Sequence, residues 1–540
     1  MKRSGGRLFA DCLEEQGIDT VFAYPGGSVL PIFDALRKRK GLRLVIPARE
    51  DQAAFMADGY ARASGKPAVC IATSGPGATN LLTGMAVSFM DSVPVVYVTG
   101  DILRDRKGSD AFQEADIWGM SLSVTKHSVV VNSAAELPGA LREAFWVASS
   151  GRPGPVLVDI PEDVLKERAE APELGREAVS RWREAHPFLW DKTHSWQREL
   201  SAAVAAGALK KTAEKIGAAR RPLILAGGGA LAAGDGILRL AEKTGVPVVT
   251  TLMGVGALPR DHILHIGMIG LYGCARANRA LAECDVLLAV GTRFSDRSMA
   301  AAEGMDDAEI IHIDIDPAEI NKNLQSYFHI TGDAGAVLGR LIAAVAPAEK
   351  TWLRRNEEYP VGWDPLGILR CAGEAAGDIP VVTDVGQHQM WAAAAWPVRK
   401  PGQWFTNAGL GTMGYGLPAA CGISLAVRSP VVAVVGDGGL KMSLAELGTL
   451  RQENVPVVLL LLDNRCLGMI RQLQQEEYGG RYTGVHLFSP DWEGVCRAYG
   501  LPYARPDSLP ALRDAVKAAV ASKAPQMIHC MIAEEELVDL

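Results

Sequence analysis

The chain has 540 residues, of which 48% are hydrophobic and 22% are charged. Because single hydrophobic cores stop growing at about 250 residues, this length predicts roughly three domains. The net charge of −7 is small for the length, and Lys and Arg form no block interleaved with aromatic residues, which argues against a nucleic-acid partner. No apolar run reaches the roughly 18 residues that a membrane span needs.

The cysteines and the first residues indicate the compartment. Nine cysteines are spread from Cys12 to Cys530 without C-x-x-C spacing. This pattern favours reduced, mostly buried thiols over a disulfide framework or a zinc site. The opening MKRSGGRLFADCLEEQG predicts an amphipathic helix with no apolar signal core before it. We therefore expect a cytoplasmic protein.

Short apolar runs rich in β-forming residues alternate with helical patterns along the whole chain, and nearly all of these runs end in Gly or Asp. The alternation is typical of doubly wound parallel sheets, an α/β fold in which the loops at the carboxyl ends of the strands build the sites. The runs are, in chain order, VFAYPGG, PAVCIATSGPG, PVVYVTG, PLILAGGG, VPVVTT, DVLLAVG, EIIHIDID, IPVVTDVG, PVVAVVGDGG and VPVVLLLLDN.

Two polar, charged and Pro-containing stretches, at about 166–190 and 346–365, are predicted to connect domains. They divide the chain into three α/β domains, at residues 1–166, 190–346 and 365–540. The first and third share a coarse strand and helix layout, but no short-period repeat or low-complexity tract is present.

In the first domain, Glu50 follows a predicted strand and begins a predicted helix in RLVIPAREDQAA. One explanation is structural, because a carboxylate in a first helical turn complements the helix dipole. Two glycine-rich segments that follow strands, GPGATN and LAGGGALAAG, are each compatible with a dinucleotide-binding turn. A tight turn without a ligand explains them equally well.

In the last domain, a Gly-Asp-Gly with Asp437 at its centre ends one predicted strand, and Asn464 ends the next strand 464 − 437 = 27 residues later. Both side chains should therefore meet at the carboxyl edge of a parallel sheet. One carboxylate and one amide suit Mg²⁺ that fills its octahedron with phosphate oxygens and water. The alternative is a chance Gly-Asp-Gly turn. Cys466, beside the motif, is better explained as a small packed residue than as a nucleophile.

This arrangement resembles the signature of thiamine-diphosphate enzymes, and the chain resembles the catalytic subunit of acetohydroxyacid (acetolactate) synthases over almost its whole length. The strings that carry the resemblance are VFAYPGGS, ATSGPGATN, GSDAFQE, TKH, SGRPGPVLVDIP, TTLMGVGALP, GTRFSDR, HIDIDPAEINKN, VGQHQMWAA, GLGTMGYGLPAA and GDG…DNRCLGM. It implies a pyrimidine-binding first domain, an FAD-binding-like central domain and a diphosphate-binding last domain.

The resemblance assigns thiamine diphosphate, Mg²⁺ and FAD as cofactors. Glu50 would contact the aminopyrimidine ring nitrogen and promote the tautomer that activates the thiazolium carbon. The main-chain carbonyl of Cys466 would join Asp437 and Asn464 on the metal, and Met413 would hold the cofactor bent. The other matched thiamine positions are Pro25, Gly26, Pro76, Asn80, Gly386, Gln387, His388, Gly411, Gly436, Gly438, Gly439, Gly468 and Met469. The positions that match the FAD site are Arg152, Gly227, Gly228, Thr251, Leu252, Gly291, Arg293, Asp296, Asp314 and Asp333.

For the substrate, a 2-oxo acid carries a carboxylate that a guanidinium grips well, and Arg297 matches the family's Arg for the acceptor. Gln113 and Lys126 match its substrate channel. Each has a structural alternative, a surface Arg in the first case and a polar contact in the other two.

The chain departs from the family in three places. GMIRQL has Leu473 where the family has a Trp that shapes the acceptor pocket, and Leu103 stands where it commonly has Pro. The chain ends at EEELVDL, before the family's Pro- and Gly-containing tail. A wider acceptor pocket is the expected result.

We therefore expect a homodimeric or homotetrameric enzyme that decarboxylates a 2-oxo acid, with pyruvate expected, and joins the product to an aldehyde or ketone. A regulatory small subunit is the further partner that the resemblance implies. Another lyase or acyltransferase on the same cofactor stays open: a 2-oxo acid decarboxylase, a sulfoacetaldehyde acetyltransferase or a cyclic dione hydrolase. The pattern of glyoxylate carboligase lacks a Glu at position 50, and the first domain lacks the His pair of simple decarboxylases. A non-catalytic cofactor-binding subunit is disfavoured by the presence of Glu50, Asp437 and Asn464.

Overall fold

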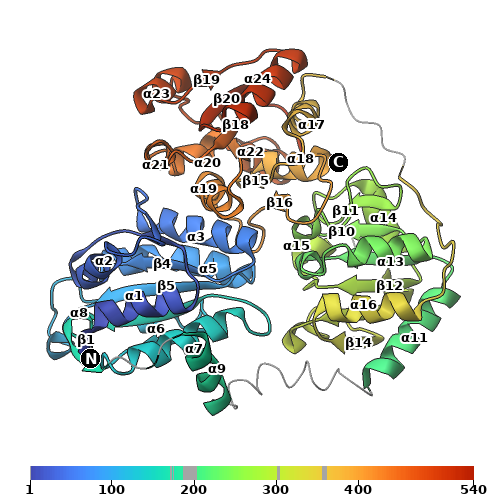
Figure 1. The fold of residues 1–540 in the computed structure, drawn as a ribbon. Helices are drawn as coiled ribbons and strands as arrows, with labels where there is room; N and C mark the ends of the chain where they lie inside the picture. The colour runs from blue at the N-terminus through green and yellow to red at the C-terminus, as the bar shows by residue number, and fades with distance from the viewer. Residues whose placement is uncertain (1, 171–172, 174, 187–203, 301–304, 356–361) are drawn as a thin grey trace.

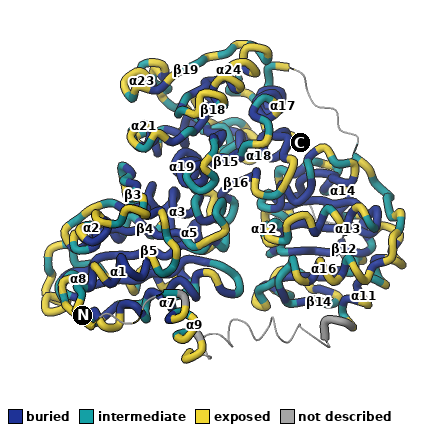
Figure 2. The backbone as a smooth tube through the Cα atoms, in the orientation of Figure 1, coloured by how far each residue is buried: buried dark blue, intermediate teal, exposed yellow. Residues whose placement is uncertain are grey.

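The computed structural model describes residues 2–170, 173, 175–186, 204–300, 305–355 and 362–540. These residues form three six-stranded sheets in which all neighbouring strands are parallel, and helices cover the sheets (Figure 1). The predicted fold class is confirmed. Figure 2 shows the central strands as buried and the exposed residues mainly on the outer helices and loops.

The first sheet has the strand order β3-β2-β4-β5-β7-β6. Its central strands are buried along their whole length because helices pack on both faces. The strands are β2 (Thr20–Ala23), β3 (Arg43–Val45), β4 (Ala68–Ala72), β5 (Val95–Asp101), β6 (His127–Val130) and β7 (Val156–Pro161), and the helices are α1 (Gly5–Glu15), α2 (Leu30–Leu36), α3 (Glu50–Ser64), α4 (Pro76–Asn80), α5 (Leu82–Met90), α6 (Ile117–Ser121), α7 (Leu137–Ser149) and α8 (Glu162–Lys166).

The central sheet has the order β11-β10-β9-β12-β13-β14. Its strands are β9 (Pro222–Ala226), β10 (Val248–Thr250), β11 (His265–Met268), β12 (Val286–Val290), β13 (Glu309–Asp314) and β14 (Phe328–Thr331), and its helices are α11 (Val204–Ala218), α12 (Gly228–Leu231), α13 (Gly236–Thr244), α14 (Ala275–Glu283), α15 (Asp296–Met299) and α16 (Ala334–Ala344).

The third sheet has the order β16-β15-β17-β18-β20-β19. Its strands are β15 (Val381–Thr383), β16 (Trp404–Phe405), β17 (Val431–Gly436), β18 (Val457–Asp463), β19 (Tyr503–Ala504) and β20 (Gln526–Met531), and its helices are α17 (Pro365–Ala376), α18 (Gln387–Ala395), α19 (Gly416–Val427), α20 (Asp437–Met442), α21 (Glu446–Glu453), α22 (Gly468–Tyr478), α23 (Trp492–Tyr499) and α24 (Leu509–Ser522).

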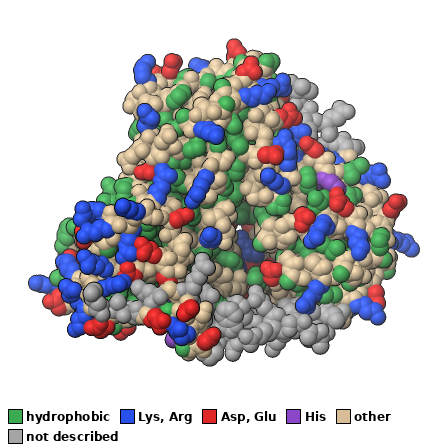
Figure 3. All heavy atoms as spheres, viewed as in Figure 1, with side chains coloured by type: hydrophobic (Ala, Val, Ile, Leu, Met, Phe, Trp, Pro, Cys, Tyr) green, Lys and Arg blue, Asp and Glu red, His purple; other side chains and the backbone are tan. Residues whose placement is uncertain are grey.

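The stretch predicted as the first connector contains regular structure. β8 (Arg168–Glu170) pairs antiparallel with β1 (Lys2–Ser4), and α9 (Arg176–Ala185) follows. The strands of the three sheets lie within 20–161, 222–331 and 381–531; the predicted domain bounds stay a prediction. None of the helices in the described residues is long and apolar enough to cross a membrane. Basic and acidic side chains are interspersed over the face in Figure 3.

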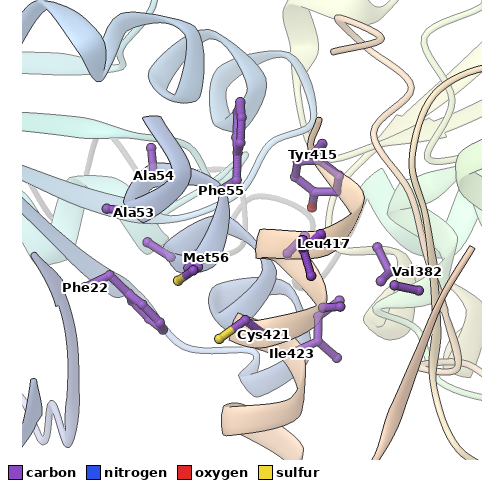
Figure 4. Close-up of a cluster of buried hydrophobic side chains, with 14 of the residues drawn as sticks. Phe22, Ala53, Ala54, Phe55, Met56, Val382, Tyr415, Leu417, Cys421 and Ile423 are labelled. Atoms are coloured by element: carbon purple, nitrogen blue, oxygen red, sulfur yellow. The ribbon is translucent and has the colours of Figure 1, made fainter. Parts of the chain in front are cut away.

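Helices α3 and α19 pack closely and join the first domain to the third (Figure 4). Two glycines permit the contact, since a Cβ at Gly59 would lie 2.4 Å from the carbonyl oxygen of Ala419, and one at Gly422 would lie 1.9 Å from that of Met56. Apolar side chains of both domains form one buried cluster around this pair. The position of Glu50, the first residue of α3, is thereby tied to the third domain.

Candidate active site

Asp437 and Asn464 lie at the same edge of the third sheet. β17 ends at Gly436, so Asp437 begins α20 directly after the strand, and Asn464 follows the last residue of β18. The two strands are parallel neighbours with Gly436 opposite Leu462. The register therefore brings the carboxylate and the amide to one carboxyl edge, as their spacing predicts.

A cavity of about 1480 Å³ opens at this edge and extends to the central domain. Its lining includes 23 of the predicted site residues, from all three domains. They are Arg152, Gly228, Thr251, Leu252, Gly291, Arg293, Asp296, Arg297, Asp314, Asp333, Gly386, Gln387, His388, Gly411, Met413, Gly436, Asp437, Gly438, Gly439, Asn464, Cys466, Gly468 and Met469. Apart from Gly227, the residues predicted for the diphosphate and for FAD thus line one continuous space.

Several buried polar atoms of the cavity have no partner within the described residues. They include Oδ2 of Asp437, Nε2 of His388 and Oε1 of Gln387. Burial raises the pKa of Asp437 to about 6, with a contribution from the neighbouring Asp463, and burial lowers the pKa of His388 to about 4. Near neutral pH the site therefore presents a carboxylate and a neutral imidazole. Unpaired buried groups are costly, so these atoms are suited to a polar ligand.

The ligand set suits a cation that is shared with a phosphate group. No cluster of three His, Cys, Asp or Glu side chains that could hold a metal is present in the part of the chain that the structure describes. Asp437 offers one carboxylate, and the amide oxygen of Asn464, which accepts a bond from the Cys466 N–H at 3.1 Å, keeps a second lone pair. Mg²⁺ with a diphosphate needs few protein oxygens and fits this set. Burial raises the pKa of the Cys466 thiol to about 11, which suits a packed residue.

Three helices begin at the cavity, α18 at Gln387, α20 at Asp437 and α22 at Gly468. Helix N-termini point main-chain N–H groups at anions, so they suit a diphosphate. A Cβ on Gly468 would lie 1.9 Å from Oε1 of Gln387, so a side chain at this position would displace that amide. Gly386 adopts a φ of +149°, which L side chains rarely adopt.

The central domain contributes a second tight glycine turn. A Cβ on Gly227 would lie 2.1 Å from the carbonyl oxygen of Gly291, and Gly291 itself has a φ of +59°. Gly227 does not itself line the cavity, but it holds the loops after β9 and β12 together. Arg152 reaches across from the first domain and pairs with Glu319 at 2.7 Å and Asp316 at 3.2 Å.

The residues predicted for the pyrimidine half gather elsewhere, at the carboxyl edge of the first sheet. Oε2 of Glu50 accepts a hydrogen bond from Nδ2 of Asn80 at 2.9 Å. A Cβ on Gly75 would lie 2.9 Å from Cα of Gln113, and one on Gly26 would meet Thr73. None of the predicted pyrimidine-side residues Pro25, Gly26, Glu50, Pro76 and Asn80 lines the cavity, and neither does Gln113. Within one chain the two halves of the predicted cofactor site are therefore apart.

The predicted substrate residues have different surroundings. Arg297 lines the cavity with a side chain that is 74% exposed, and Leu473 lines it too. Lys126 does not line it; its Nζ donates to the main-chain oxygens of Val147 and Ser150 at the end of α7. Burial lowers the pKa of Lys126 to about 8, and nearby Arg152 contributes. Lys126 thus has the contacts of a helix C-terminal cap.

Asn407 is a site residue that the sequence interpretation missed. It is fully buried, lines the cavity, and its Nδ2 has no partner within the described residues. It lies just after β16 (Trp404–Phe405). Like Asn464, Asn407 is an amide that follows a parallel strand, here with Thr406 between them, and it would have been identified had the two-residue strand been recognised.

Three family models match the chain, one for each sheet. The N-terminal TPP binding domain of thiamine pyrophosphate enzymes matches residues 3–120, their central domain matches 209–341, and their C-terminal TPP binding domain matches 384–530. Thiamine pyrophosphate (TPP) is another name for thiamine diphosphate. The fold and the cavity thus place the chain in the class of thiamine pyrophosphate enzymes.

Relatives narrow this class. The acetolactate synthase large subunit of Parasynechococcus marenigrum is 40% identical over 558 residues, which cover 99% of this chain and 88% of the relative. The acetolactate synthase isozyme 3 large subunit of Escherichia coli is 39% identical over 92% of this chain and 88% of its own. The mitochondrial acetolactate synthase catalytic subunit of Saccharomyces cerevisiae is 38% identical, and the match covers 97% of this chain and 80% of the relative. The chain belongs to the acetolactate synthase family, which confirms the predicted resemblance.

Proposed function

We propose that this enzyme decarboxylates pyruvate and joins the remaining two-carbon unit to a second 2-oxo acid or aldehyde. The observation that carries the proposal is the cavity at which three helices begin and which contains the unpaired carboxylate oxygen of Asp437 and the unpaired Nε2 of His388. That arrangement suits a diphosphate with a divalent cation. Thiamine diphosphate, when bound, supplies the electron sink that decarboxylation needs.

The chain's own residues would bind and orient this cofactor. Asp437, Asn464 and the Cys466 carbonyl would hold Mg²⁺, and Glu50 would hold a proton at the pyrimidine ring nitrogen. The orientation of Glu50 is supported by its hydrogen bond from Asn80. The exposed guanidinium of Arg297, at the cavity wall, would bind the carboxylate of the acceptor.

FAD is proposed as the ligand of the central part of the cavity. Support comes from the close contact of Gly227 with Gly291 and from the loops after β9 and β12 that line the space. The role of Gln113 and Lys126 in the substrate channel stays a prediction. The cytoplasmic location of the protein also stays a prediction.

A complete site is proposed to need two chains. Glu50 and its neighbours do not line the cavity that contains Asp437, although both groups act on one cofactor in this proposal. A second copy that brings its first domain to this cavity would complete the site, so the smallest active unit would be a homodimer. Because the relative from Escherichia coli is named a large subunit, a regulatory small subunit is the further partner to test.

The direct test incubates purified protein with pyruvate, thiamine diphosphate, Mg²⁺ and FAD, measures carbon dioxide, and identifies products with a panel of oxo acids and aldehydes. Acetolactate from pyruvate alone is the expected product. Carbon dioxide with acetaldehyde and no coupled product would instead indicate a simple decarboxylase. Absence of carbon dioxide release from a protein that binds all three cofactors would contradict the proposal.

A further inference from the structure

The turn from Asn464 to Leu467, directly after β18, carries two of the three proposed metal ligands. Arg465 within it adopts a left-handed conformation with a φ of +57°, which is unfavourable for a residue with a side chain. Such a conformation persists only where the surroundings hold it. The shape of this turn decides where the Asn464 amide and the Cys466 carbonyl point.

Asp463 holds the turn from behind. Its Oδ1 accepts the N–H of Arg465 at 3.0 Å, and its main-chain oxygen accepts the N–H of Ile532 at 3.1 Å. Asp463 is 1% exposed and does not line the cavity. Its carboxylate therefore acts on the turn and not on a ligand.

The other oxygen of this carboxylate is held by three side chains. Oδ2 of Asp463 accepts from Ser489 at 2.7 Å, from Trp492 at 3.0 Å and from Nε2 of His529 at 3.1 Å. His529 is buried on β20, the strand beside β18. A carboxylate accepts only, so Nε2 of His529 donates to Asp463, and Nδ1 on the other side of the ring is hydrogen-bonded to the Tyr503 hydroxyl at 2.8 Å.

We propose that Tyr503, His529 and Asp463 form a positioning relay that fixes the turn bearing Asn464 and Cys466 and so sets the affinity of the site for Mg²⁺ with thiamine diphosphate. The inference rests on the proposed function of this site. None of the three residues lines the cavity, so the relay acts through the turn. Hydrogen-bond partners behind a metal ligand typically change metal affinity by about 10–100-fold when they are removed.

The experiment titrates MgCl₂ into the cofactor-free protein in the presence of thiamine diphosphate and follows binding by calorimetry. His529→Leu is expected to weaken Mg²⁺ binding by about 10–100-fold, and kcat at saturating Mg²⁺ is expected to fall far less than this affinity. His529→Gln, which keeps an N–H donor, should restore part of the affinity, and Tyr503→Phe should show a smaller loss. The matched control is His265→Leu, which removes a histidine equally buried in β11 of the central domain.

A purely structural role would lower the melting temperature of the cofactor-free protein in His529→Leu and in His265→Leu alike and leave the Mg²⁺ affinity unchanged, which overturns the relay. If His529→Leu does not fold, unchanged Mg²⁺ affinity in both His529→Gln and Tyr503→Phe overturns it as well. The experiment distinguishes failure of the relay from failure of the proposed function. A wild type that binds Mg²⁺ with thiamine diphosphate but releases no carbon dioxide from pyruvate overturns the proposed function alone, because the binding titration still decides on the relay.

Discussion

Oε1 of Glu446 accepts a hydrogen bond from the main-chain N–H of Ala48 at a distance of 2.9 Å, across the boundary between the first and third domains. The other oxygen of this buried carboxyl accepts from the Thr449 hydroxyl at 2.7 Å. Ala48 lies two residues before Glu50, and Glu446 begins α21, which follows the helix that Asp437 begins. The segment that bears Glu50 is therefore fixed by the third domain of the same chain.

Glu446 should make the stability of the fold depend on pH. Burial raises its pKa from 4.5 to about 7, with a smaller contribution from Asp51. Because the folded-state pKa of Glu446 lies above its unfolded value, the stability that its protonated carboxyl contributes is fully present below about pH 4.5. This stability is lost as pH rises through about 7. Glu446→Gln should reduce the difference in unfolding free energy between low and high pH by up to about 3 kcal/mol. Chemical unfolding at pH 5 and pH 8 measures it, with the exposed Glu349→Gln as control; equal pH dependence in both variants would refute the assignment.

Glu50→Gln should keep cofactor binding and lose turnover. Its amide can still meet Asn80, but it no longer holds a carboxylate at the pyrimidine, so turnover should fall by about 10²-fold or more. The decisive measurement is proton–deuterium exchange at the thiazolium carbon. Asp51→Asn, the neighbouring carboxylate in the same helical turn, is the control. Normal exchange in Glu50→Gln would show that this residue has another role.

The separation of the two half-sites predicts complementation between inactive variants. Asp437→Ala should lose thiamine diphosphate and Glu50→Gln should lose turnover, yet a mixed dimer would contain one site with neither substitution. We expect activity to return when the two proteins are mixed under conditions of subunit exchange. Two differently tagged copies establish that exchange has occurred. Exchange without recovered activity would argue that each chain forms its site alone.

The sequence predicted the strands whose local pattern is strong. All ten apolar runs contain a strand, because each is a continuous apolar run and nearly all end in Gly or Asp. The strands outside these runs include β6, β7, β11, β14 and β20, besides β16 and β19, which have two residues each. The pair of β1 with β8 joins residues 2–4 to 168–170, and no local pattern encodes such a contact.

The sequence indicated where Asp437 and Asn464 lie for the same reason, and it stopped at the same limit. Asp437 and Asn464 follow from strand ends in one sheet, whereas the distance between Glu50 and the cavity depends on how α3 packs on α19. That packing requires small residues at Gly59 and Gly422, which in sequence are indistinguishable from other helical glycines. The contacts of Lys126 were not predictable from sequence either, since its partners are main-chain oxygens at the end of α7, more than 20 positions along the chain.

Gly227→Ala tests the proposed FAD region. The new methyl group would lie 2.1 Å from the carbonyl oxygen of Gly291, so the loops after β9 and β12 must move apart. We expect flavin affinity to fall at least about tenfold, the equivalent of 1.4 kcal/mol. The control is Gly207→Ala in α11, where nothing lies within 4 Å of an added Cβ. Flavin absorbance after gel filtration reports retention, and equal retention in both variants would place FAD elsewhere or exclude it.

Leu473 should leave the acceptor pocket wider than the Trp that the family has at this position. It lines the cavity in the same helix, α22, as Gly468 and Met469, so a larger side chain at this position would narrow the space beside the proposed cofactor. A difference of a methylene or two in an apolar pocket is worth only about 1–3 kcal/mol. The wild type should therefore discriminate modestly between pyruvate and 2-oxobutanoate as acceptor.

Leu473→Trp should change this discrimination by adding a flat wall that contacts the acceptor side chain. The measurement is a competition between the two oxo acids, with the ratio of products determined for wild type and variant at equal turnover. Leu473→Met, which nearly conserves volume, is the matched control and should keep the wild-type ratio. The variant is expected to accept fewer of the panel's larger acceptors. A wild type that already strongly prefers 2-oxobutanoate, with a product ratio that Leu473→Trp leaves unchanged, would show that this side chain does not contact the acceptor.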